Sequence, residues 1–141
     1  MSEEFYDAAI RHWYDGRILE ENMEYDNAVC MQGFAAECAL KKIIQVAYPI
    51  DVIKKYGHDG DKLLDDICVL LMNDSSMLAA LDPALGLRLQ DVHLSELLFK
   101  NHPERRYYKD GIYSKNDVEA CRHDAEKIIN EMLRLCIEGY I

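Results

Sequence analysis

Apolar residues recur every three or four positions along much of this chain, and this spacing limits the fold more than any other feature. An α-helix turns once every 3.6 residues, so such residues form one stripe along its side. The clearest stripe consists of Val118, Cys121, Ala125, Ile128, Met132 and Leu135. The sequence lacks the alternation of apolar and polar residues that indicates a half-buried strand. We therefore predict an all-α protein.

Breaks in this pattern divide the chain into five expected helices, because proline and glycine tend to end helices. The expected ranges are 3–22, 25–47, 61–73, 83–100 and a last helix that opens at Ser114–Asp117. That opening reads Ser-Lys-Asn-Asp, a version of the Ser-x-x-Glu capping box. Long amphipathic helices with short connections pack as an up-down bundle. The range 25–47 is rich in small residues, which allow close helix approach, so we expect it at the centre.

The length of 141 residues is sufficient for one domain, residues 1–141, with its own apolar core. There are 26 Asp and Glu against 16 Lys and Arg, a net charge of −10, which argues against broad coating of nucleic acid. No apolar run reaches the roughly 18 residues of a membrane-spanning helix. The N-terminus lacks the basic start and apolar run of a secretory signal, so we expect a cytoplasmic protein without membrane contact.

The cysteines and histidines do not follow the spacing of known metal sites. Five cysteines occur without a CxxC pair, and we expect reduced thiols in the core. His58, His93 and His102 lie in separate segments. The glycine-rich loops that hold nucleotide phosphates are also missing from the sequence. We therefore predict no metal site and no cofactor.

Two short motifs place polar residues where a ligand could bind. Glu37 and Lys41 are four residues apart within the apolar run AAECALKKII, so they form a helical pair that is either partly buried or simply solvated. His58 lies between Gly57 and Asp59, just before an expected helix. It is either a site residue or part of a helix entry, in which Asp59 or Gly60 caps the helix and His58 holds the loop by a hydrogen bond.

One stretch of this acidic chain is basic. Residues 100–115 contain five Lys or Arg and two Asp or Glu, a local charge of +3. Arg105, Arg106 and Tyr107 combine cations with an aromatic ring, a combination that suits phosphate contact and base stacking. The alternative is a loop that Tyr packing and Arg pairing fix to the bundle.

These motifs occur in an order that resembles the HEPN family (higher eukaryote and prokaryote nucleotide-binding domains). The resemblance covers nearly the whole chain. The matching positions are Tyr25, Ala28, Gly33, Glu37, Ala39, Leu40, Lys41, His58, Asp59, Leu63, Leu64, Arg106 and Tyr107. It implies a helical bundle, commonly a homodimer, that binds a nucleotide, RNA or a partner nucleotidyltransferase in a toxin–antitoxin or defence module. The candidate ligand residues are Glu37, Lys41, His58, Arg105, Arg106 and Tyr107.

Other members of the family are ribonucleases that use an Arg-x4–6-His motif from two copies of the chain. No histidine follows Arg106 within six residues, whereas Arg88 and His93 have the required spacing. The resemblance therefore implies Arg88 and His93 as catalytic residues of a metal-independent ribonuclease. On a straight helix, five residues place these side chains about 140° apart, so a bend would be needed for them to converge. A third alternative is a purely protein-binding scaffold or antitoxin.

Overall fold

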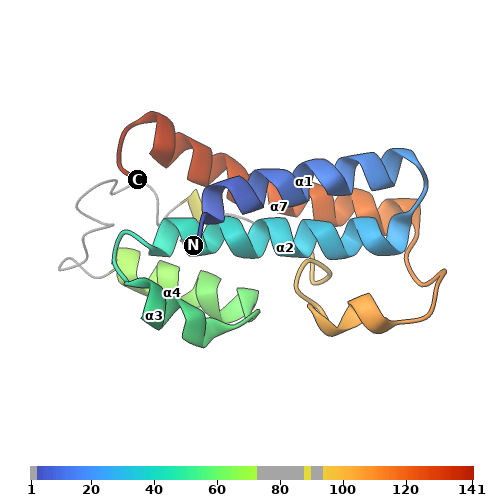
Figure 1. The fold of residues 1–141 in the computed structure, drawn as a ribbon, viewed down its shortest axis with the longest axis horizontal. Coiled ribbons are helices and arrows are strands. Elements are labelled where there is room, and N and C mark those ends of the chain that lie inside the picture. The colour runs from blue at the N-terminus through green and yellow to red at the C-terminus, as the bar shows by residue number, and fades with distance from the viewer. Residues whose placement is uncertain (1–2, 73–87, 90–93) are drawn as a thin grey trace.

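The computed structural model describes residues 3–72, 88–89 and 94–141. Within these ranges the chain forms five α-helices and no strand, as the apolar spacing predicted (Figure 1). In chain order the elements are α1 (Phe5–Glu21), α2 (Tyr25–Ile44), α3 (Ile50–Ile53), the 3₁₀ helix η1 (Lys54–Tyr56), α4 (Gly60–Met72), the 3₁₀ helix η2 (Glu104–Tyr107) and α7 (Lys115–Ile137).

Helix α2 lies at the centre of the bundle and contacts α1, α7, α4 and η2. Helices α1 and α7 run along one side of α2, while α4 packs on its other side, where α3 also lies (Figure 1). The predicted central position of this helix is confirmed. Its small residues explain the close packing, since Ala28, Ala35, Ala36 and Ala39 have no exposed surface.

Helix α7 begins with the predicted capping box. The Ser114 hydroxyl accepts a hydrogen bond from the backbone N–H of Asp117 at 3.2 Å. In return, the Asp117 carboxylate accepts one from the backbone N–H of Ser114 at 2.9 Å. Two donors that the helix cannot satisfy internally are thereby bonded. Its predicted apolar stripe is buried and faces α2 and α1.

The expected helix over 83–100 is wrong in its C-terminal part, because residues 94–100 are not helical and form turns and bends from residue 96 on. Arg88 and Leu89 are helical, and the rest of the expected range lies outside the described residues. The carbonyls of Leu97, Leu98 and Lys100 accept hydrogen bonds from the Arg105 guanidinium. In a continuing helix these carbonyls would accept from backbone N–H groups. Here they accept from the Arg105 side chain, and the backbone leaves the helical path.

Two other boundaries differ from the prediction. Helix α2 ends at Ile44 and a turn occupies residues 45–47. Residues 48–60, which separate the expected helices 25–47 and 61–73, contain α3 and η1. Among the described residues, no helix has the length and apolar character that crossing a bilayer requires.

Candidate functional site

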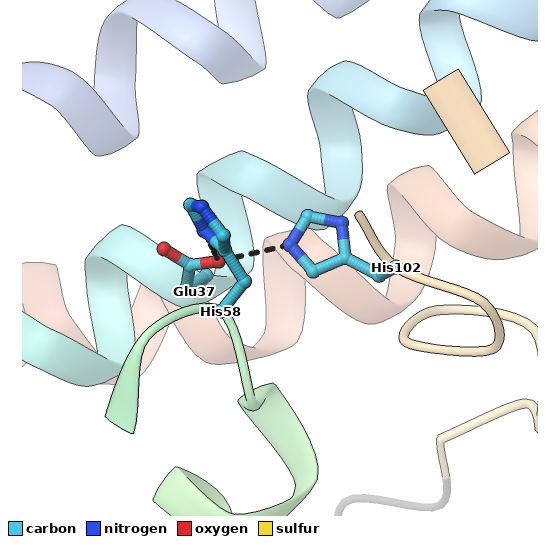
Figure 2. Close-up of side chains that lie close together, drawn as sticks. All are labelled: Glu37, His58 and His102. Atoms are coloured by element: carbon cyan, nitrogen blue, oxygen red, sulfur yellow. Dashed lines mark hydrogen bonds and ion pairs between the residues drawn. The ribbon is translucent and has the colours of Figure 1, made fainter. Parts of the chain in front are cut away.

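Glu37 lies in the middle of α2 and is the centre of a buried polar cluster. Only 3% of the residue is exposed. One carboxylate oxygen, Oε1, lies 2.9 Å from Nδ1 of His58 and 2.9 Å from Nε2 of His102 (Figure 2). The other oxygen, Oε2, lies 3.0 Å from Nζ of Lys41. The carboxylate therefore links α2 to two loops that are distant in the sequence.

The cluster keeps Glu37 ionised. Burial by itself raises the pKa of the carboxyl group, but hydrogen bonds from His102, Lys41 and His58 and the charge of Lys41 outweigh it. The net result is a pKa of Glu37 below its ordinary value. A buried carboxylate needs such partners, because an unpaired charge in the interior is costly.

Lys41 fixes the loop that carries His58. Its ammonium group donates to Glu37 and, at 2.7 Å, to the carbonyl of Gly57. The side chains of Lys41 and Glu37 are 12% and 4% exposed, so of the two alternatives the structure has the buried pair and not the solvated one. Gly57 has a φ of 57°, a conformation that favours glycine, and it turns the chain so that His58 follows directly beside Glu37.

His58 is the accessible histidine of the cluster. Its side chain is 46% exposed, whereas that of His102 is completely buried. His58 also lines two cavities, one of about 500 Å³ shared with His102 and Arg106, and one of about 790 Å³ shared with His12 and Lys41. A carboxylate on Nδ1 orients the ring and leaves the second nitrogen to exchange a proton or bind a ligand.

His102 is held by aromatic rings and by Glu37. The centroid of its ring lies 4.6 Å from that of Phe34 and 6.0 Å from that of Phe99. Its Nδ1 atom is buried and has no hydrogen-bond partner among the described residues. Nε2 faces the ionised carboxylate, so in this arrangement the ring proton belongs on Nε2. Sequence reasoning did not select His102, because it is 65 residues from Glu37 and belongs to no motif.

The two neighbouring arginines have different positions. Arg105 is 3% exposed and its guanidinium donates to the carbonyls of Val29, Leu97, Leu98 and Lys100. Its donors therefore stabilise the loop rather than face a cavity. The loop is also attached to α2 through Asp26. The Asp26 carboxylate accepts hydrogen bonds from the backbone N–H groups of Gly111 and Tyr113. This agrees with the alternative in which the basic loop is fixed to the bundle.

Arg106 lies on the outside, at the cavity of about 500 Å³ that His58 and His102 line. Its guanidinium carbon is 5.9 Å from the centre of the Phe34 ring and 4.8 Å from that of Tyr107. Tyr107 itself is 76% exposed. The structure thus brings together four of the six predicted ligand residues, Glu37, Lys41, His58 and Arg106, with Tyr107 at the edge and Arg105 facing inward.

The predicted catalytic pair is only half described. Arg88 donates from Nε to the Glu131 carboxylate of α7 at 2.7 Å, and its side chain is 26% exposed. His93 lies outside the described residues. Whether the two side chains converge stays a prediction.

Comparisons with known proteins provide no assignment for this geometry. No protein-family model matches the chain, and searches of curated proteins and of solved structures find no match.

Proposed function

We propose that this protein is an HEPN-like module that binds a phosphate group of a nucleotide or RNA beside Arg106. The proposal depends on one observation: Arg106 and His58 line the same cavity of about 500 Å³, and the exposed Tyr107 ring lies against the guanidinium. A guanidinium can bind phosphate through two parallel hydrogen bonds. An exposed aromatic ring can stack on a base.

The charge around this cavity limits how much nucleic acid it can hold. Asp59, Asp61 and Glu104 line it together with Arg106. Three carboxylates beside one guanidinium repel a chain of phosphates, so we expect contact with one phosphate only. For single strands, a plot of log affinity against log salt concentration has a slope of about −0.7 for each phosphate contact. One contact therefore predicts a shallow slope of roughly −0.7.

Binding of fluorescein-labelled single-stranded RNA, measured by anisotropy at several salt concentrations, tests this proposal. Arg106→Ala should weaken binding at least about tenfold, the equivalent of one charge-assisted hydrogen bond. Lys109→Ala is the matched control, because it removes the same charge from the same exposed loop, away from the cavity. Equal affinities for the two variants, or no binding by the unmodified protein, would contradict the proposal.

Ribonuclease activity is a second candidate, favoured by the hydrogen bond that orients His58 on Glu37. His58 would accept the proton of a 2′-hydroxyl as its oxygen attacks the phosphorus of the phosphate that Arg106 holds. The P–O5′ bond would break, and the protonated His58 would return the proton to the leaving 5′ oxygen. Incubation of labelled RNA with His58→Ala and His93→Ala separates the two histidines. Loss of cleavage in His58→Ala alone supports this site, and loss in His93→Ala alone supports the Arg88–His93 pair. Absence of cleavage by the unmodified protein rejects both.

We also propose that the chain self-associates through α1. Tyr14 and Ile18 are one helical turn apart and are 58% and 40% exposed, so they form an apolar strip on this helix. Such an interface should be insensitive to salt. Light scattering should show a dimer that Ile18→Glu converts to a monomer, whereas an Ile137→Glu control should stay dimeric.

The scaffold or antitoxin alternative has a different test. It would be supported if this protein binds no RNA and a nucleotidyltransferase co-purifies with it.

A further inference from the structure

Three side chains of the type that bind transition metals meet in the buried cluster. Oε1 of Glu37, Nδ1 of His58 and Nε2 of His102 all lie within 4.8 Å of one another. They come from α2, from the loop before α4 and from the loop before η2 (Figure 2). We propose that Glu37, His58 and His102 form a binding site for one divalent transition-metal ion of the zinc type. The spacing of the histidines in the sequence did not indicate a metal site. Only the fold brings the three ligands together.

The ligand set and its spacing suit such an ion. Two imidazoles and one carboxylate bind zinc in enzymes and iron in oxygenases. In the tetrahedral geometry that zinc prefers, a metal–ligand distance of about 2.1 Å places two neighbouring ligands about 3.4 Å apart. Glu37 Oε1 lies 2.9 Å from each histidine nitrogen. The three ligand atoms lie within 4.8 Å of one another, so an ion could replace the two shared protons once the histidine rings move by roughly half an ångström.

The residues around the proposed metal site provide negative charge, and the site is open to solvent on the side of His58. Lys41 occupies only Oε2 of Glu37, so Oε1 stays available while the carboxylate remains oriented. Asp59, Asp61 and Glu104 line the cavity next to His58 and His102, and outnumber the one guanidinium there. This acidic lining favours entry of a cation. Because the His58 side chain is 46% exposed, water or a substrate could complete the coordination, as in catalytic sites.

The same structure limits the affinity. A histidine that binds metal usually donates its other N–H to an acceptor, and loss of that partner typically weakens binding about 10–100-fold. Nδ1 of His102 has no such partner among the described residues. The Lys41 ammonium beside Glu37 also opposes a second cation. We therefore expect a dissociation constant in the micromolar range rather than the nanomolar range.

The test uses Zn²⁺ and Co²⁺ alone, on full-length protein freed of metal with a chelator. Competition with a chromophoric chelator should show one Zn²⁺ per chain, and Co²⁺ should give a visible spectrum without thiolate charge transfer. His58→Ala should weaken Zn²⁺ binding at least about tenfold, and it removes a partly exposed side chain. His123→Ala is the matched control, an exposed histidine on α7 that should leave binding unchanged.

Three results would overturn the metal site: no binding at millimolar Zn²⁺, equal affinity in His58→Ala and the unmodified protein, or a Co²⁺ spectrum dominated by thiolate. No nucleotide or RNA is present in this experiment. Its failure is thus distinguishable from failure of the proposed function, which Arg106→Ala tests separately.

Discussion

The Arg105 guanidinium lies directly against the backbone of Gly33. A Cβ atom added at residue 33 would come within 2.5 Å of Nη2 of Arg105 and within 2.8 Å of Nδ1 of His102. Both side chains are buried and held in place, by four carbonyls and by Glu37 respectively. A side chain at position 33 therefore has no space unless one of these groups moves.

Gly33→Ala should destabilise the protein by about 1–3 kcal/mol, the usual cost of overpacking. Helix propensity acts in the other direction, since alanine is favoured over glycine in a helix by about 1 kcal/mol. The sign of the change in the free energy of unfolding, measured with urea, decides between the two effects. A stabilised variant would show that Arg105 and His102 move aside easily.

Arg105→Met should destabilise the protein by about 3 kcal/mol or more, because buried carbonyls lose a charged donor. Arg105→Lys should rescue little of this loss, since a single ammonium cannot replace the planar fork of donors. Arg106→Ala is the neighbouring control and should change the free energy of unfolding by about 0.5 kcal/mol at most. Similar losses for the two positions would contradict the assignment of the buried role to Arg105.

Ser114→Ala should cost about 1 kcal/mol, because it removes the acceptor at the N-cap of α7. Ser114→Asp should retain most of the stability, since aspartate is also a good N-cap residue. Thermal unfolding followed by circular dichroism measures both. If Ser114→Asp melts as early as Ser114→Ala, the cap does not contribute through its hydrogen bond.

The cysteines should differ in their reactivity with iodoacetamide. Burial raises the pKa of Cys38 to about 11 and that of Cys121 to about 12, so almost no thiolate forms there at pH 8. Burial also raises the pKa of Cys136, but this residue is partly accessible. Mass spectrometry after short exposure should find Cys136 labelled first and Cys121 last. Early labelling of Cys121 in folded protein would contradict its burial.

The parts of the fold that were predictable depend on residues close together in the sequence. The stripe of α7, its capping box and the pair of Glu37 and Lys41 all involve spacings of three or four residues. Helix α3 was missed because four residues are too few to show a period. The non-helical stretch 94–100 was missed because its carbonyls bond to Arg105, a tertiary contact that overrides the local pattern.

In the candidate site, too, the residues in short local motifs were predictable and the residue brought in by the fold was not. Glu37, Lys41 and His58 were selected from short motifs, and the structure places them in contact. His102 was not selected, because its contact with Glu37 spans 65 residues. An ionisable residue inside an apolar run was the available signal. It indicates that a partner must exist, but the fold alone determines which histidine that partner is.

Four hydrogen bonds of the Arg105 guanidinium end on main-chain carbonyls. A carbonyl is present whichever side chain a residue carries, so substitutions at Val29, Leu97, Leu98 or Lys100 leave these acceptors chemically intact. The anchor therefore depends on the arginine at position 105 and on the space that Gly33 leaves for it, and not on the side chains of the residues that supply the carbonyls. Homologous chains could diverge widely in the surrounding loop while Arg105 stays unchanged.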